Sequence, residues 1–417
     1  MTDFRFLHAA DIHLDSPLHG LSRYEGLPEA EIRGATRAAF DALVRRAIEE
    51  AVDFVVLAGD LFDGDWKDMG TGLYFARAMG ELHLAGIPVF LIAGNHDAAS
   101  VISRSIPWPP NVRVFDARKP QTYRLDDLKV AVHGQSFSTP AVTDNLVLAY
   151  PDRLEHCFNI GMLHTALAGR TGHAPYAPCS LDDLKAKHYD YWALGHVHEF
   201  ERVCDAPHVI FPGNIQGRTI RETGPKGAVL VSVRDGAVEA VDRVALDVLR
   251  WAAVVVDCTD ANTQAVPDLI QAALATTWRS QAESLPLIVR LTLVGETDDA
   301  GTLLDGASGL RDVARALAVA ISPDLYIEKV RVHVQAKSIS MEDVVSEGFS
   351  AALAEAASAT ELAALLAEDL QPFLLAARTG LDAPEDTDLR WAAAGGDWSV
   401  ILDTAALALQ SRLLKAA

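Results

Sequence analysis

The sequence lacks several features that would assign a chain of 417 residues to a special class. It has only four cysteines and no CxxC pair, which argues against a zinc ribbon or a dithiol redox motif and favours reduced thiols in a cytosolic protein. No run of about 18 apolar residues occurs, so we expect no membrane span. No basic segment followed by a long apolar stretch opens the chain, so we expect a cytoplasmic protein without a secretory signal.

Positive charge is also scarce. The chain has 36 Lys and Arg residues against 57 Asp and Glu residues, a net charge of −21, which by itself argues against a polyanionic partner. The excess of acidic residues is unevenly distributed along the chain, because residues 341–417 hold 13 acidic and 4 basic residues, a net charge of −9. Apolar residues at 50% and charged residues at 22% are ordinary for a globular protein, and the length predicts two to three domains.

The first part of the chain has the pattern of an α/β domain. Apolar strands alternate with helical spacing over 35–51 and 71–85, which predicts a mostly parallel sheet with right-handed crossovers. Later apolar segments are joined by short polar stretches, which predicts a second, more antiparallel sheet. We therefore predict one domain over residues 1–245, with strands at 4–10, 53–58, 87–93, 129–133, 159–163, 191–194, 208–212 and 228–233.

The pattern changes after residue 245. Strand and helix segments alternate as βαβαβ, with strands at 254–257, 287–295 and 325–334, so residues 246–337 are predicted to form a small separate domain. Residues 338–417 are rich in Ala, Leu and Glu and are predicted to form a helical tail. Five residues of the tail fall on one helical face: Trp398, Ile401, Leu402, Ala405 and Leu409.

Five short polar motifs each follow a predicted strand, at the edge where ligand sites form in open α/β sheets. Their imidazole, carboxylate and amide groups suit a divalent transition metal such as manganese, iron or zinc. Seven donors are too many for one ion but suit two, which can clamp the attacking and leaving oxygens of a phosphoryl displacement. The motifs are Asp11-x-His13, Gly59-Asp60-x-x-Asp63, Gly94-Asn95-His96-Asp97, Gly161-x-x-His164 and Gly195-His196-x-His198.

The ordered set of these motifs resembles the calcineurin-like metallophosphoesterase superfamily. GDLFD (59–63), GNHD (94–97) and LGHVH (194–198) followed by FPGN (211–214) resemble its DNA-repair nuclease branch, which includes SbcD-type exonuclease subunits and YhaO-like proteins. The segment YAPCSLDDL…YDYWALGHVH…FPGNIQGR looks closest to the YhaO-like group. The resemblance implies a four-layer α/β/β/α sandwich with a small α+β cap domain and a helical C-terminal tail.

The resemblance also implies a role for each matching residue. Two divalent ions are expected, with manganese favoured and iron or zinc as alternatives. His96 would be the general acid and Asp97 would orient its ring, while Asp63 would support the site without binding metal. The metal ligands would be Asp11, His13 and His198 for one ion, Asn95, His164 and His196 for the other, and Asp60 as the bridge.

The loop after the last motif contains basic side chains that could meet substrate phosphates. Arg218, Arg221 and Lys226 lie in GRTIRETGPKG, and an ordinary solvated loop is an equal alternative for them. The first function hypothesis is a metal-dependent DNA nuclease, either an exonuclease or an endonuclease, that acts in DNA repair or end processing. The resemblance implies DNA and an SMC-like coiled-coil ATPase as partners, with homodimer formation through the phosphoesterase domain as a further expectation.

Two alternatives stay open. A small-molecule phosphodiesterase or phosphatase of the same superfamily fits the net charge of −21, because DNA binding usually draws on a basic surface. A non-catalytic assembly subunit would need a missing ligand, and the motif set is complete. The acidic, amphipathic tail suits docking on a partner better than DNA binding, and packing against its own domain is its alternative.

Overall fold

The computed structural model describes residues 3–16, 27–63, 69–99, 108–167 and 176–337, together with five single positions beyond residue 337. The predicted helical tail at 338–417 therefore lies almost entirely outside the described residues. One compact unit comprises the described residues up to Ala252 with 278–289 and 324–328, and the other holds 253–277, 290–323 and 329–337. The predicted domain boundary at residues 245/246 stays a prediction.

Within the described ranges, the first unit is built on two six-stranded sheets. The first has the order β12-β11-β1-β2-β3-β4, with β1 to β4 parallel and β11 and β12 antiparallel. Parallel pairing sets the carboxyl ends of β1, β2 and β3 at one edge of this sheet. Its strands are β1 (Phe4–Ala9), β2 (Phe54–Ala58), β3 (Val89–Ile92), β4 (Val112–Val114), β11 (Gly227–Arg234) and β12 (Ala237–Ala245).

The second sheet is mixed rather than mainly antiparallel. Its order is β5-β6-β7-β8-β10-β9, and the central pairs β6–β7, β7–β8 and β8–β10 are parallel, while β5 and β9 at the two edges pair antiparallel. The prediction of a more antiparallel sheet is therefore wrong for its centre. Its strands are β5 (Gln121–Leu125), β6 (Val130–Gly134), β7 (Phe158–His164), β8 (Tyr191–Gly195), β9 (Glu201–Asp205) and β10 (His208–Phe211).

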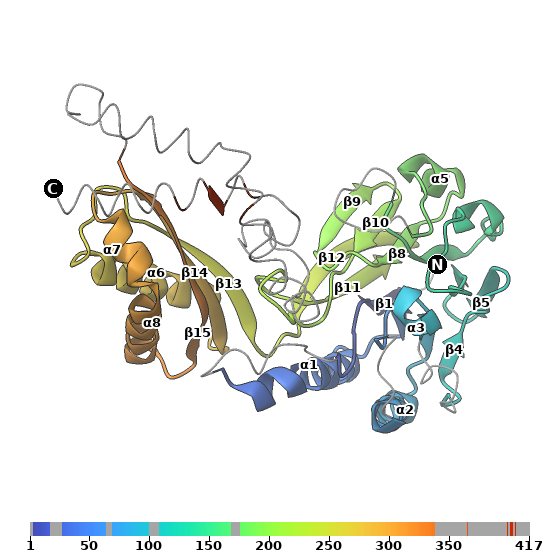
Figure 1. The fold of residues 1–417 in the computed structure, drawn as a ribbon. Helices are drawn as coiled ribbons and strands as arrows, with labels where there is room; N and C mark the ends of the chain where they lie inside the picture. The colour runs from blue at the N-terminus through green and yellow to red at the C-terminus, as the bar shows by residue number, and fades with distance from the viewer. Residues whose placement is uncertain are drawn as a thin grey trace. The chain divides into compact units, whose positions relative to one another are not determined.

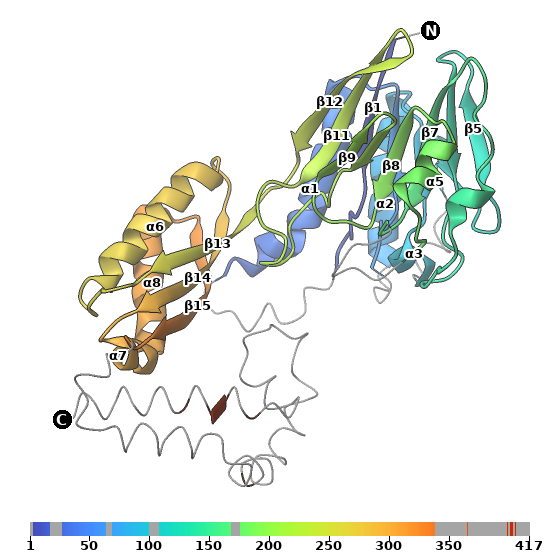
Figure 2. The same cartoon turned by 90° about the horizontal axis from the view of Figure 1, so that it is seen from above.

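The two sheets pack face to face, and helices cover their outer faces. Aromatic residues such as Phe6, Phe54 and Tyr191 fill the layer between the sheets and are fully buried there. Helices α1 (Glu29–Glu49) and α2 (Met69–Leu84) pack on the first sheet, and α5 (Leu181–Ala186) with the 3-10 helix η2 (Leu146–Ala149) packs on the second (Figures 1 and 2). This is the expected four-layer α/β/β/α arrangement.

A third sheet has the order β13-β14-β15 and follows the first two in the chain. Helices α6 and α8 lie on one face of it (Figure 1). In its middle strand (Leu287–Glu296), the side chains of Leu287, Val289, Leu291 and Leu293 alternate along the chain and are fully buried. The elements are β13 (Arg250–Asp257), α6 (Val266–Gln281), β14 (Leu287–Glu296), α7 (Ala300–Asp305), α8 (Ala307–Ile321) and β15 (Leu325–Gln335).

Two further expectations can be compared with the structure. All four cysteines carry free thiols. Within the described ranges, the helices fall short of the combination of length and apolar character that crossing a bilayer requires.

Candidate metal centre

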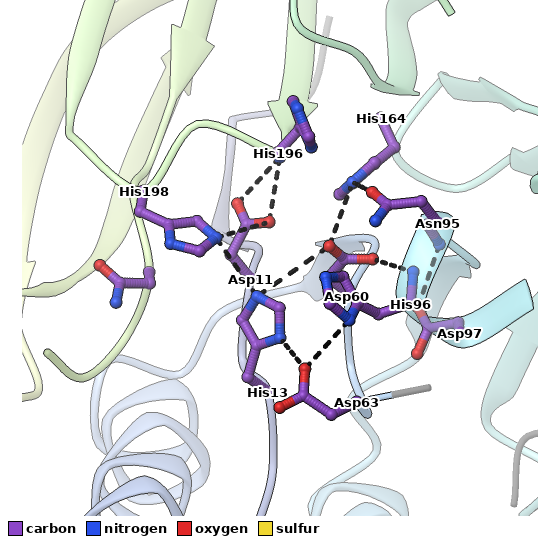
Figure 3. A network of polar contacts seen from close by, with 12 residues as sticks. Asp11, His13, Asp60, Asp63, Asn95, His96, Asp97, His164, His196 and His198 are labelled. Carbon is purple, nitrogen blue, oxygen red and sulfur yellow. Dashed lines mark hydrogen bonds and ion pairs between the residues drawn. The ribbon is translucent and has the colours of Figure 1, made fainter. Parts of the chain in front are cut away.

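The predicted ligands are carried by turns that directly follow parallel strands. Asp11 and His13 follow β1, Asp60 follows β2, and the short helix α3 (Asn95–Ala99) begins at the third residue after β3. His164 ends β7, and His196 and His198 follow β8 in the second sheet. The structure therefore brings both sheets to one site through the ends of their strands, and Figure 3 shows these side chains directed toward one another.

The turns after β1 and β2 are joined by backbone hydrogen bonds. The amides of Asp11 and His13 donate to the carbonyls of Gly59 and Asp60, both at 3.0 Å. Gly59 has φ +95°, and a Cβ there would overlap the His164 ring, so only glycine fits between the two sheets at this point. These backbone bonds thus fix the spacing of the turns that carry the donor side chains.

Among the residues that the structure describes, potential ligand atoms gather into three overlapping groups, each with its atoms within 4.8 Å of one another. Asp60 belongs to two of the groups, which is the position that a bridging carboxylate would need. Asn95 joins them, because its Oδ1 lies 3.0 Å from His164 Nε2. The groups are Asp11 with His13 and His198, His13 with Asp60 and His96, and Asp60 with His164 and His196.

Three of the histidines are oriented by a partner on the outer ring nitrogen. The Nδ1–H of His13 donates to Asp63 Oδ1 at 2.7 Å, and that of His198 donates to Glu222 Oε1 at 2.7 Å. His164 Nδ1–H donates to the carbonyl of Ala58 at 3.0 Å. Because Nδ1 carries the proton in each neutral ring, every Nε2 presents a lone pair to the centre.

These inward lone pairs make the site fit a cation. His13 Nε2 and His198 Nε2 lie 3.2 Å apart, and His164 Nε2 faces both Asn95 Oδ1 and, at 3.4 Å, Asp60 Oδ2. Acceptor atoms that face one another at such distances repel unless a proton or a metal ion lies among them. The donor set of imidazole nitrogens, carboxylates and one amide oxygen suits a divalent transition metal.

The pKa shifts reflect the same demand for positive charge. Burial raises the pKa of Asp11 to about 6. Burial alone would raise the pKa of Asp60, but the neighbouring His164 lowers it well below the ordinary range. In return, the charge of Asp60 outweighs the burial of His164 and raises the pKa of that imidazole to about 9. The Asp60–His164 pair therefore favours an ionised Asp60 carboxylate beside a positively charged group.

The structure corrects the predicted partner of the His96 ring. The Asp97 carboxylate accepts hydrogen bonds from the backbone amides of Leu61, Phe62 and Gly94, so it braces the turns and does not orient the ring. His96 Nδ1 instead lies 3.2 Å from Asp63 Oδ1. Asp63 thus supports both His13 and His96 from outside the ligand set (Figure 3).

The predicted phosphate contacts also change. The ammonium of Lys226 is buried, at 3% exposure, where it donates to His198 O at 3.0 Å and to Glu199 Oε1 at 2.5 Å. The prediction that Lys226 meets substrate is therefore wrong, because its charge is already used within the fold. Arg218 forms an ion pair with Glu222. Arg221 is exposed, and its contact with substrate phosphates stays a prediction.

Glu222 is a supporting residue whose contact with His198 sequence reasoning missed. It lies 24 residues after His198, and its contact depends on the return of the loop between β10 and β11. No motif in the sequence marks this contact, because Glu222 lies in the polar loop GRTIRETGPKG outside the five motifs. That the seven predicted ligands hold metal also stays a prediction, although the structure brings all of them together.

Comparison with known proteins gives family matches in two parts of the chain. Residues 4–200 match the calcineurin-like phosphoesterase family, and residues 251–335 match the middle domain of metallophosphoesterase YhaO. Among solved structures, a dimetal phosphatase from Danio rerio is 12% identical, with coverage of 58% of this chain and 97% of that chain and a TM-score of 0.35.

Two curated relatives are informative. The DNA double-strand break repair protein Mre11 of Sulfurisphaera tokodaii is 27% identical over 265 residues, which is 60% of this chain and 64% of that protein. The uncharacterized metallophosphoesterase YhaO of Bacillus subtilis is 38% identical over 320 residues, which is 75% of this chain and 76% of that protein. The chain therefore belongs to the calcineurin-like metallophosphoesterases, enzymes that bind two divalent metal ions, and within them to the YhaO-like group.

Proposed function

We propose that this protein is a divalent-metal-dependent DNA nuclease that hydrolyses phosphodiester bonds in DNA repair or end processing. The observation that carries the proposal is Asp60, which is shared by two groups of potential ligands, His13 with His96 and His164 with His196. Two divalent cations held there would neutralise the phosphodiester and polarise its phosphorus–oxygen bonds. The similarity to a DNA double-strand break repair protein supports DNA as the substrate.

We propose that His96 protonates the leaving oxygen. Its side chain is 44% exposed, whereas those of His13 and His164 are buried, so a substrate can approach the His96 ring. The contact with Asp63 raises the pKa of His96, which favours the protonated ring. With Nδ1 directed at Asp63, the proton on Nε2 is the one that can be given to the leaving group.

The partners stay part of the proposal. We propose that an SMC-like coiled-coil ATPase delivers DNA to the centre, because a chain with a net charge of −21 offers little attraction for a polyanion on its own. The same net charge favours the second candidate, a small-molecule phosphodiesterase or phosphatase with this metal centre.

The test is cleavage of labelled linear and hairpin DNA with added Mn²⁺, beside hydrolysis of a bis-aryl phosphodiester. Parent protein is compared with His96→Ala, which removes the proposed acid but none of the seven predicted ligands. We expect the variant to lose about 10²- to 10⁴-fold in DNA cleavage with its metal content retained.

The outcomes separate the candidates. DNA cleavage by the variant at the parent rate would contradict the role of His96. Hydrolysis of the diester without DNA cleavage, both alone and with the ATPase, would favour the small-molecule enzyme. DNA cleavage that begins only when the ATPase is added would support both the nuclease and its partner.

A further inference from the structure

One side of the metal centre is enclosed by a continuous chain of charged groups. His13 Nδ1 contacts Asp63, and the Nη1 of Arg218 lies 3.8 Å from the other oxygen of Asp63. Arg218 also donates from its backbone amide to Glu222 Oε2 at 2.7 Å and from Nη2 to Oε1 at 2.9 Å. Glu222 Oε1 in turn accepts from His198 Nδ1. The charged groups therefore connect the outer nitrogens of two predicted ligands of the same ion.

The loop that carries Arg218 and Glu222 holds His198 at several points. The backbone amide of Asn214 donates to the His198 carbonyl at 3.3 Å, and Lys226 Nζ donates to the same oxygen at 3.0 Å. Glu222 fixes the ring itself. The backbone and the side chain of His198 are thus both set by residues 212–226, which have no predicted ligand among them.

The second donor group is built differently. The outer nitrogen of His164 donates to a backbone carbonyl, that of Ala58, instead of to a carboxylate. A carboxylate on the outer nitrogen makes an imidazole a more basic ligand and restricts its rotation more strongly than a neutral carbonyl does. The two halves of the centre therefore differ in their support.

We propose that Glu222 and Arg218 are positioning residues for the ion held by Asp11, His13 and His198, and that they act on this ion alone. Glu222 orients His198 directly. Arg218 keeps Glu222 in place and links it to Asp63 behind His13. The proposal rests on the two-metal centre and is independent of whether DNA is the substrate.

The test is binding of Mn²⁺ alone to the full chain, followed by calorimetry and by low-temperature electron paramagnetic resonance. Parent protein should bind two ions and give the spectrum of a coupled pair. Glu222→Gln keeps the size of the side chain. It should weaken the binding of one of the two ions by about 10- to 100-fold, so that the variant gives a mononuclear spectrum at two equivalents of Mn²⁺. Glu239→Gln, an exposed position on β12, is the matched control and should bind like the parent.

A second ligand change identifies which ion is affected. His164→Ala removes a predicted ligand of the other ion, so Glu222→Gln combined with His164→Ala should leave no tight ion. One tight ion in the double variant would overturn the proposal, and so would equal weakening of both ions in Glu222→Gln alone. Parent-like binding by Glu222→Gln would also overturn it.

Arg218 gives an independent check. Arg218→Met should weaken the binding of the same ion and leave the other ion at parent affinity, because the guanidinium contacts Glu222, lies 3.5 Å from His198 Nδ1 and lies 3.8 Å from Asp63. Equal weakening of both ions by Arg218→Met would overturn its place in the proposal. Retention of one tight ion in every single variant also reports that the protein is folded, since an unfolded chain would lose both.

Discussion

Four of the seven predicted ligands have left-handed backbone conformations, which are uncommon outside glycine. Asp11, His13, Asp60 and His196 have φ values of 50°, 46°, 52° and 99°. Such residues typically cost about 1–3 kcal/mol each and persist where the surroundings determine them. For Asp11, His13 and Asp60 the backbone bonds between the turns after β1 and β2 supply that constraint, and the His196 amide donates to the Asp11 carboxylate. The strain is concentrated where the side chains must converge.

At the same scale, one buried histidine outside the centre makes stability depend on pH. His8 donates from Nε2 to the Leu194 carbonyl at 3.1 Å and accepts from the Tyr191 hydroxyl at 2.9 Å, so its neutral ring is satisfied. Burial lowers the pKa of His8 to about 3. Between that value and the ordinary 6.5 of the unfolded chain, only the unfolded state takes up the proton, so stability falls as the pH falls.

We therefore predict that His8→Gln, which can keep both hydrogen bonds, reduces this acid sensitivity. The free energy of unfolding of metal-free parent should drop between pH 7 and pH 5 by about 2 kcal/mol more than that of the variant, at about 1.4 kcal/mol per pH unit. Urea titrations at the two pH values measure both drops. Equal drops would show that His8 does not contribute to the pH dependence.

Individual residues also mark what the sequence could and could not predict. The convergence of the seven predicted ligands could be predicted, because each lies in a short motif at the end of a strand and strand ends meet at one edge of the fold. Asp97 was given the wrong partner, because its motif places it near His96 in sequence while the fold turns its carboxylate toward three backbone amides. Glu222 could not be assigned, since its contact depends on the path of a loop.

At the scale of elements, the parallel strands of the core were predictable from apolar periodicity, whereas the edge strands of the sheets and the ends of the helices were not. The apolar spacing predicted a helix over 35–51, yet α1 begins at Glu29. Its first turn includes Glu29 and Glu31, and these polar residues gave no apolar spacing from which the start of the helix could be predicted. The edge strands β5 and β9 are half-buried or exposed over most of their length and gave no apolar run to detect. Pairing with a neighbour, rather than burial, makes them strands.

Glycines in different elements should respond in opposite ways to alanine. Gly59→Ala places a Cβ against the His164 ring at φ +95°, so we expect a loss of about 1–3 kcal/mol in stability from the backbone and weaker Mn²⁺ binding. Gly34 lies exposed within α1 with nothing near its Cβ position, so Gly34→Ala should add about 0.5–1 kcal/mol. Thermal unfolding and calorimetry measure both effects. Parent-like metal binding by Gly59→Ala would contradict the tight fit described here.

At the scale of the whole molecule, the metal centre joins the two sheets of the first unit. Asp11, His13, Asp60 and Asn95 come from the ends of the first sheet, and His164, His196 and His198 come from the second. A bound ion therefore adds a link between layers that otherwise meet through buried aromatic side chains such as Phe6 and Tyr191.

Metal removal should consequently lower the stability of the folded chain. Each ion that binds only the native state adds about 2.7 kcal/mol at a free concentration one hundred times its Kd. We predict that chelation lowers the unfolding temperature of the parent and that added Mn²⁺ restores it. Asp60→Asn, which alters the proposed bridge, should show a smaller response in the same thermal scans. An equal response of parent and variant would argue against Asp60 as a shared ligand.

The backbone bonds that continue past the ends of β1 and β2 have a consequence for how the protein is assembled. The backbone amides of Asp11, His13 and Leu14 donate to backbone carbonyls across the turns, so these bonds use no side-chain atom that could bind metal. Leu14 also pairs with Phe62 beyond the strand ends. These amides should resist hydrogen exchange in the chelated protein as well as in the loaded one. The order of events is then folding first and metal loading second. In the cell, the ion that arrives would be chosen by a finished site and by the metal supply at that moment.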